Sequence, residues 1–349
     1  MVRKILYAML VFGAVGFVAD LLGASPVLVF IFSALGLIPL ADLIGEATEG
    51  LALYTGPRVG GLLNATLGNA AELIITLFAI RAGLLELVKA SITGSILGNL
   101  LLVLGLSLLL GGLRNGLQRF DRRQAGQNAT MLILAVIALA IPSFFSTAID
   151  PDFAAEKAFS ESVAAVMIVI YGLSVLYSIA THEGPLARDA AVHGHWWSLP
   201  RVLVTLVAAT VGTALLSEVL VNAVEHVTEV LGLTEIFLGI ILVPLIGNVA
   251  EHLVAVEVAA KNDMELSLAV SLGSSLQIAL FVAPLLVFIS LLFDHALLLI
   301  FNGFELAALF SASLVATLIA VDGESNWLEG AQLLAVYLII GLAFFFLPA

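Results

Sequence analysis

The sequence predicts an all-α polytopic membrane protein, and three observations lead to this fold class. Of its 349 residues, 61% are hydrophobic and only 11% are charged, with a mean hydropathy of +1.15, whereas soluble domains carry about 25% charged residues. Apolar runs long enough to span a ~30 Å hydrocarbon core as a helix recur from end to end. No stretch is long and polar enough to form a separate soluble domain.

Charged residues, prolines and glycines divide the chain into candidate transmembrane helices. Several candidates exceed the ~20 residues needed to cross, so we expect tilted helices or extensions into water. The eleven expected spans cover residues 4–22, 26–54, 58–82, 86–112, 123–149, 157–182, 200–231, 233–261, 265–293, 296–321 and 327–348.

The first span has a competing interpretation. Its basic start and apolar middle are typical of a signal peptide, but no convincing A-x-A cleavage site follows, so we expect it to be retained as a leading helix over residues 1–24. The remaining topology is the same in either case.

Lys and Arg predict the orientation of the spans. Loops on the side of the N-terminus carry ten of the 13 basic residues, and loops on the other side carry Arg81, Lys89 and Lys157. We therefore expect a cell-membrane protein with a cytoplasmic N-terminus and, after eleven spans, an external C-terminus.

Net charge and cysteine content exclude some partners and sites. The formal net charge is −13, which argues against nucleic acid, because nucleic-acid binding needs a basic surface. The chain has no cysteine, so disulfides and thiolate metal sites are excluded. The lipid bilayer and cations are the expected partners, and a homo-oligomer is left open.

An internal repeat appears when the sequence is shifted against itself by 179 residues. The shift aligns GNAAE (Gly68–Glu72) with GNVAE (Gly247–Glu251), and without a gap it aligns Gly94 and Ser95 with Gly273 and Ser274. Five spans separate the equivalent helices, and an odd number reverses their direction through the membrane. We therefore expect one transporter domain with two inverted five-helix halves, over residues 25–182 and 200–349, joined by a cytoplasmic loop over 183–199.

Each repeat buries one glutamate, Glu72 or Glu251, near the middle of an apolar span. A carboxylate in hydrocarbon costs several kcal/mol unless it is paired or protonated, which favours function over simple helix packing. Two nearby carboxylates in low dielectric cannot both stay ionised alone, so either a cation or protons must neutralise them. Competition between a cation and protons for the same oxygens is the physical basis of cation/proton antiport.

A divalent hard cation such as Ca²⁺ needs six to eight oxygen ligands, so we expect neighbouring polar residues to supply the rest. The alternative is that these residues only hold helices together. The candidate ligands beside the two glutamates are Asn69, Asn248, Ser95, Asn99, Ser274 and Gln277.

Further acidic residues accompany both halves. Glu46 and Glu218 are the better-embedded ones and are candidates for lining a polar cavity or relaying protons, although solvation at helix ends is the interpretation that we slightly favour. The other acids in these spans are Asp42, Glu49, Glu225 and Glu229, and Glu305 is a lone embedded acid without an evident partner. The central loop carries His182, His193 and His195, a titratable regulatory element or, as we favour, an ordinary wet loop.

These residues resemble the CAX family of Ca²⁺/H⁺ exchangers, whose hallmark is a pair of GNxxE motifs. The resemblance covers nearly the whole chain from about residue 35. It also includes GSILGNLLLVLG (Gly94–Gly105), LGSSLQIALFVAP (Leu272–Pro284) and DGESNWLEGAQLLAVYLI (Asp322–Ile339).

The resemblance implies eleven helices, with Glu72 and Glu251 as the alternating Ca²⁺ and H⁺ site, and the six polar neighbours in support. Some relatives carry a polar residue where this chain has Gly98, so that ligand is expected to be absent. The related Na⁺/Ca²⁺ exchangers typically have additional acidic ligands that this chain lacks, which favours H⁺ as the counter-ion.

We therefore expect a secondary antiporter that exchanges cytoplasmic Ca²⁺ for external H⁺, with no cofactor besides the transported ions. A Na⁺-coupled exchanger, or one for another divalent cation, is the nearest alternative. A passive channel fits less well, because two carboxylates would hold Ca²⁺ too tightly for fast conduction unless several sites interact. An intramembrane enzyme is disfavoured, because the sequence has no HExxH motif.

Overall fold

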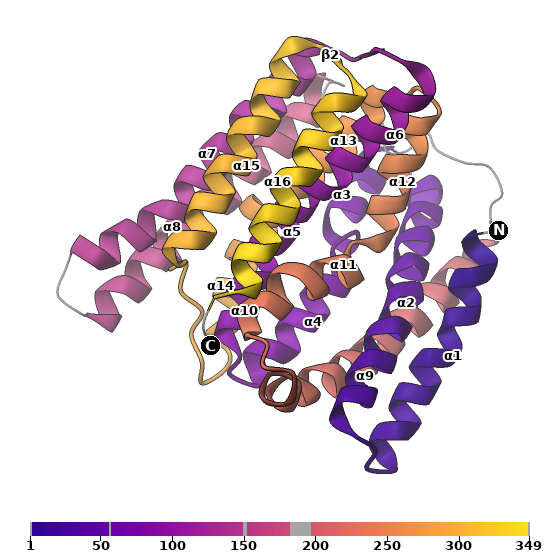
Figure 1. The fold of residues 1–349 in the computed structure, drawn as a ribbon, viewed down its shortest axis with the longest axis vertical. Helices are drawn as coiled ribbons and strands as arrows, with labels where there is room; N and C mark the ends of the chain where they lie inside the picture. Colours follow the sequence, from indigo (N-terminus) through magenta and orange to yellow (C-terminus); the bar gives the residue numbers. More distant parts are fainter. Residues whose placement is uncertain (1, 56, 149–151, 182–196, 348–349) are drawn as a thin grey trace.

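The computed structural model describes residues 2–55, 57–148, 152–181 and 197–347. Helices account for nearly all of them, as expected (Figure 1). Eight helices in the described residues are long and apolar enough to cross a membrane, a bent pair makes up to nine, and α1 adds a shorter apolar helix. The fold is therefore that of a helical multi-span membrane protein.

The first half of the chain begins with long helices and then becomes segmented. Its helices, in order, are α1 (Val2–Leu21), α2 (Pro26–Thr55), α3 (Pro57–Leu67), α4 (Ala70–Arg81), α5 (Leu85–Leu97), the π-helical segment η1 (Gly98–Val103), α6 (Leu104–Asn115), α7 (Arg122–Ala148) and α8 (Phe153–Thr181).

The second half shows the same succession of long and segmented helices. It contains α9 (Leu199–Leu231), α10 (Glu235–Phe237), η4 (Leu238–Leu242), α11 (Val243–Gly247), α12 (Val249–Ala260), α13 (Met264–Gln277), η5 (Ile278–Val282), α14 (Ala283–Ser290), α15 (Gly303–Asp322) and α16 (Trp327–Phe345).

Two groups of long helices lie on either side of the segmented helices (Figure 1). One group consists of α1, α2 and α9, which pack together. The other consists of α7, α8, α15 and α16. Between α1 and α2, a Cβ at Gly36 would collide with the backbone of Gly13, so the two helices approach to backbone contact there. The segmented helices carry the largest buried core, including Leu97, Leu101 and Ile278.

A small β pairing is an addition to the expected all-α fold. Strands β1 (Gln118–Arg119) and β2 (Glu324–Ser325) pair antiparallel, with Gln118 opposite Ser325. They join the turn before α7 to the turn between α15 and α16, so two connections far apart in sequence are held at the same end of the molecule (Figure 1).

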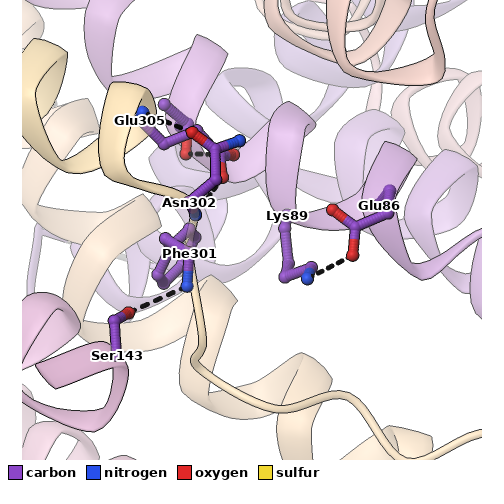
Figure 2. Close-up of polar contacts among 7 residues, drawn as sticks. Glu86, Lys89, Ser143, Phe301, Asn302 and Glu305 are labelled. Atoms are coloured by element: carbon purple, nitrogen blue, oxygen red, sulfur yellow. Dashed lines mark hydrogen bonds and ion pairs between the residues drawn. The ribbon is translucent and has the colours of Figure 1, made fainter. Parts of the chain in front are cut away.

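Three expected spans differ from the structure. The spans 58–82 and 233–261 were expected to be continuous, but each is broken at its GN motif. The span expected over 296–321 starts later, because α15 begins at Gly303 behind a capping box in which Asn302 accepts from the Glu305 N–H and the Glu305 carboxylate accepts from the Asn302 N–H (Figure 2).

The segment before α15 has neither helix nor strand structure, and serine hydroxyls accept hydrogen bonds from the backbone of its three buried residues. The N–H of Phe301 donates to Ser143 Oγ of α7 at 2.9 Å (Figure 2), and that of Leu299 donates to Ser160 Oγ of α8 at 3.2 Å. The N–H of Leu297 donates to Ser290 Oγ of α14 at 2.8 Å. These bonds satisfy buried donors that an irregular segment would otherwise leave unpaired.

The expectation that Glu305 has no partner is wrong. Besides capping α15, its carboxylate accepts a 3.1 Å hydrogen bond from Thr93 Oγ1 of α5, and the residue is 1% exposed. Glu305 therefore ties the start of α15 to α5. The central-loop histidines His182, His193 and His195 lie outside the described residues.

Candidate functional site

Both GN motifs lie at helix breaks. α4 begins after Asn69, its N-cap residue, and α12 begins after Asn248, with a bend of 66° between Glu235–Gly247 and α12. Glu72 and Glu251 therefore each lie in the first turn of a helix. Unpaired backbone N–H groups and the helix dipole make this position favourable for a carboxylate.

The two breaks face each other through their glycines. A Cβ at Gly68 would lie 3.4 Å from Glu251 Oε1, and a Cβ at Gly247 would lie 3.3 Å from Glu72 Cβ. The glycine of each motif thus packs against the glutamate of the other motif. These reciprocal contacts bring both carboxylates to one region.

Glu72 is fully buried, at 0% exposure. Ser95 Oγ of α5 donates to its Oε1 at 2.5 Å, and Ser91 Oγ lies 3.4 Å from the same oxygen. Asn248 Nδ2, from the other half, donates to Ser95 Oγ at 3.1 Å. Ser95 therefore links the glutamate of one repeat to the asparagine of the other.

Glu251 has an analogous serine but a more open environment. Ser274 Oγ of α13 donates to its Oε2 at 2.5 Å, and Asn99 Nδ2 donates to Ser274 Oγ at 3.0 Å. Glu251 itself is half-buried.

Asn69 does not repeat the contact of Asn248. Its Nδ2 donates to Gln277 Oε1 at 2.9 Å, where the equivalent position of the first half is Gly98. With this pair, each of the eight residues predicted as cation ligands hydrogen-bonds another of the eight. The structure therefore brings the whole predicted set together, and its ion-binding role stays a prediction.

Three oxygens of this network are buried without a hydrogen-bond partner in the described part of the chain: Glu72 Oε2, Asn69 Oδ1 and Asn248 Oδ1. A buried, unpaired oxygen is costly unless something else compensates it. In the part of the chain that the structure describes, no cluster of three or more His, Cys, Asp and Glu side chains is suited to hold a metal ion. A cation bound here would therefore take amide and hydroxyl oxygens together with the two carboxylates.

A cavity of about 630 Å³ reaches the site from one side. Glu251, Ser274 and Gln277 line it, whereas Glu72 does not. Additional acidic residues, Asp42, Glu46, Glu49 and Glu257, line the same cavity. The cavity therefore leads to Glu251 between acidic side chains, and Glu72 is buried behind it.

The two acids predicted to relay protons fall in different places. Glu46 lines the cavity, with Tyr7 OH 3.3 Å from its Oε2. Glu218 does not line it; its side chain is 46% exposed and lies 3.6 Å from Arg81. The structure therefore brings Glu46, and not Glu218, to the approach to the site.

Sequence reasoning missed two features of the site. Ser91 lies one helical turn before Ser95, and this i, i+4 spacing could have identified it. The π-helical segments η1 and η5 follow the site residues of α5 and α13 in both halves. Such segments are frequent at functional sites, and nothing in the apolar sequence there signals them.

Comparison with known proteins agrees with these features. The sodium/calcium exchanger protein family model matches residues 25–180 and again 201–346. The chain is 44% identical to a Ca²⁺/H⁺ antiporter of Aphanothece halophytica over 370 residues, covering 99% of this chain and 97% of the relative. It is also 44% identical to the Ca²⁺/H⁺ antiporter ChaA of Bacillus subtilis (strain 168), over 89% of this chain and 90% of the relative.

Solved structures give the same result. The structure of native YfkE matches with a TM-score of 0.87 at 39% identity, covering 99% of this chain and 100% of that chain. The H⁺/Ca²⁺ exchanger CAX has a TM-score of 0.76 at 16% identity, covering 99% of this chain and 92% of that one, and shares the fold. Since the similarity extends over the full length at 44% identity, the chain belongs to the CAX family of Ca²⁺/H⁺ antiporters, within the sodium/calcium exchanger superfamily, a family of transporters and not of enzymes.

Proposed function

We propose that this protein exchanges cytoplasmic Ca²⁺ for external H⁺ at one mid-membrane site shared by Glu72 and Glu251. The observation that carries the proposal is the reciprocal packing of the two GN motifs, which brings the buried carboxylate of Glu72 and the half-buried one of Glu251 to one region. The names of the full-length relatives, Ca²⁺/H⁺ antiporters, supply the identity of the ions.

The oxygens around the two glutamates suit a hard divalent cation. Ca²⁺ takes six to eight oxygen ligands from carboxylates, amides and water. Glu72 Oε2, Asn69 Oδ1 and Asn248 Oδ1 are buried and unpaired in the described residues, and the Glu251 carboxylate faces the cavity that would admit the ion. Ser95 and Ser274 hold the glutamates in place through their hydroxyls.

Exchange follows from competition for the same oxygens. A bound Ca²⁺ balances two ionised carboxylates, and in its absence protons must neutralise buried carboxylates in a low-dielectric site. Ca²⁺ and H⁺ therefore displace each other. Apparent Ca²⁺ affinity should fall as the pH on the side facing the site falls, because protonation removes the charge that binds the cation.

We further propose eleven crossings, made of a leading helix and two inverted five-helix halves, with the N-terminus in the cytoplasm. The double match of one family model supports the duplication. The same order of broken helix, polar helix and π-helical segment in both halves supports it as well. With this orientation the cavity at Glu251 opens to the cytoplasm, because it extends to Glu257 and Ala260 near the end of α12, beside Lys261.

Transport into inside-out vesicles tests this function. Vesicles with an acidic interior are given ⁴⁵Ca²⁺ without Na⁺, and Ca²⁺ uptake and internal pH are followed together. We expect Ca²⁺ uptake coupled to proton release, which stops when the pH gradient is collapsed. Uptake that requires Na⁺, or that persists without the gradient while Ca²⁺ still moves uphill, would contradict Ca²⁺/H⁺ exchange and favour a Na⁺-coupled exchanger.

A further inference from the structure

A second cavity, of about 1030 Å³, lies between α7, α8 and α13, away from the opening at Glu251. Its volume is at the upper end of the range for pockets that hold small organic ligands. Met131 of α7, Leu173 of α8 and Leu276 of α13 are among its apolar wall residues. We call it the α7–α8 cavity.

The α7–α8 cavity has the depth of one membrane leaflet. On α7 it extends from Arg122, the first residue of the helix, to Met131, a rise of about 13 Å at 1.5 Å per residue. Half of a ~30 Å hydrocarbon core is about 15 Å. On the antiparallel α8, the lining runs back from Tyr171 to Ser178. The cavity therefore leads from the end of the helices towards the middle of the membrane.

Two arginines lie at the end of the α7–α8 cavity where α7 begins. Arg122 and Arg123 line it and are exposed. In the described residues neither lies within 4.0 Å of a carboxylate in an ion pair. The nearby Asp121 accepts from the backbone N–H groups of Arg123 and Gln124 as a helix cap. Two positive charges beside an apolar cavity are complementary to a molecule with an anionic head and a hydrocarbon tail.

A buried polar group lies at the deep end of the α7–α8 cavity. Tyr171 lines the cavity and is 8% exposed, and its hydroxyl has no hydrogen-bond partner among the described residues. Its ring is fixed by stacking on Phe281, with the ring centroids 5.4 Å apart. Buried tyrosine hydroxyls usually find a partner, so an occupant of the cavity, or water that enters with it, is expected to supply one.

We propose that the α7–α8 cavity binds an anionic phospholipid, with the phosphate at Arg122 and Arg123 and an acyl chain between α7 and α8 that extends towards Tyr171. Gly273 and Gln277 of α13 line both this cavity and the one at Glu251. The lipid would therefore pack against the helix that carries Ser274 and Gln277, on the side away from the path of the ion. Binding of the lipid is a property separate from ion exchange.

Native mass spectrometry of the purified full chain tests the proposal, with phosphatidylglycerol and phosphatidylcholine offered in equal amounts. We expect one tightly retained lipid with a preference for phosphatidylglycerol. Each arginine near an anionic headgroup contributes about 1 kcal/mol, which corresponds to roughly fivefold in affinity. The substitutions Arg122→Ala and Arg123→Ala should therefore each reduce that preference about fivefold, and Arg119→Ala, whose side chain is exposed and lies 3.8 Å from Glu324, should leave it unchanged.

A glycine pair tests the cavity without changing charge. A Cβ at Gly126 or at Gly172 would meet nothing within 4 Å, but only Gly126 lines the cavity. Gly126→Leu should displace both lipids, and Gly172→Leu should displace neither; thermal melting checks that all variants fold.

Equal retention of the two lipids by wild type and the arginine variants would overturn headgroup recognition. Retention in Gly126→Leu would overturn the location, and a change of oligomer size in that variant, with lipid retention unchanged, would assign the face to a second copy of the chain. Excess inorganic phosphate should not displace the lipid; if it does, phosphate alone is the ligand and the proposal fails.

Discussion

The two glutamates of the repeat have the same sequence context but different surroundings. Glu72 is at 0% exposure, held by Ser95, whereas Glu251 is half-buried, held by Ser274, and lines an acidic cavity. The motifs and the serines that hold the glutamates match, but Ser91, the second hydroxyl beside Glu72, is replaced by Val270 at the equivalent position. The packing of the surrounding helices adds to this difference, and we interpret the two environments as one conformation of a transporter whose two ends open in turn.

A smaller difference concerns the asparagines. Asn248 donates to Ser95, the serine that holds Glu72, but Asn69 donates to Gln277 and leaves Ser274 to Asn99. The repeat position of Gln277 is Gly98, around which a Cβ would meet nothing within 4 Å. The site is therefore symmetric in its carboxylates and asymmetric in its amides.

Neutralising either carboxylate should give the largest effect. Glu72→Gln and Glu251→Gln each keep the shape but remove a charge that the proposed Ca²⁺ site needs, so exchange should fall to the level of protein-free vesicles while the protein stays folded. The measurement is ΔpH-driven ⁴⁵Ca²⁺ uptake together with thermal melting. Glu324→Gln, at an exposed glutamate beside Arg119, is the control, and robust exchange in either site variant would refute the shared site.

The second-largest effect should be a difference in the accessibility of cysteines introduced at equivalent positions of the two halves. The chain has no cysteine, and Ser91 and Val270 occupy equivalent repeat positions. Val270 lines the cavity at Glu251, and Ser91 is 1% exposed beside Glu72. In inside-out vesicles a membrane-impermeant thiol reagent should modify the Val270→Cys variant rapidly and the Ser91→Cys variant hardly at all. Equal modification rates of the two variants would show that both glutamate environments are equally accessible in the membrane, and would contradict the difference in burial.

The amide asymmetry should produce an intermediate effect. Gln277→Gly makes the second half resemble the first and leaves Asn69 Nδ2 without its acceptor, so the half-saturating Ca²⁺ concentration should rise about five- to tenfold, in line with the cost of an unpaired buried group. Gly98→Gln is the matched change in the first half and should have less effect on apparent affinity, because it removes no hydrogen bond. If the two variants behave alike in the uptake assay, the Asn69–Gln277 bond has no part in binding.

Glu305 should show the smallest effect, although it too is a buried carboxylate. Gln can replace Glu in a capping box, so Glu305→Gln should cost less than ~1 kcal/mol of stability and leave Ca²⁺ uptake close to wild type. The measurements are thermal melting and ⁴⁵Ca²⁺ uptake, beside Glu72→Gln. Loss of uptake in a stably folded Glu305→Gln variant would place this residue with the transporting carboxylates and not with the helix caps.

Much of the site could be predicted because the internal repeat can be recognised directly in the sequence. A duplicated glutamate in an apolar run identified Glu72 and Glu251, and helical spacing identified their polar neighbours, which the structure brings into hydrogen-bond contact. The span over residues 296–321 was expected to be helical throughout because its residues are apolar, and Asn302-x-x-Glu305 is a capping box that could have marked the start of the helix.

Other features could not be predicted from the sequence. Which glutamate faces a cavity depends on the packing of α2, α12 and α13, and two nearly identical motifs cannot specify it. The same holds for Glu218: its place in an apolar span suggested a relay, but the structure puts it beside Arg81. The π-helical segments could not be predicted either, because η1 (GNLLLV) and η5 (IALFV) share no residue pattern that would distinguish them from the α-helix around them.

The three serine hydroxyls at the segment before α15 have a consequence for how insertions and deletions are tolerated. The N–H groups of Leu297, Leu299 and Phe301, at every second residue, donate to hydroxyls from three different helices. These hydroxyls take the place that a neighbouring β-strand would have, so the segment has a register although it has no strand partner. Loss or gain of one residue would offer the N–H groups of the intervening positions to the serines and turn the buried side chains away from the core. A change in the length of this segment would therefore alter its contacts with α7, α8 and α14 at once.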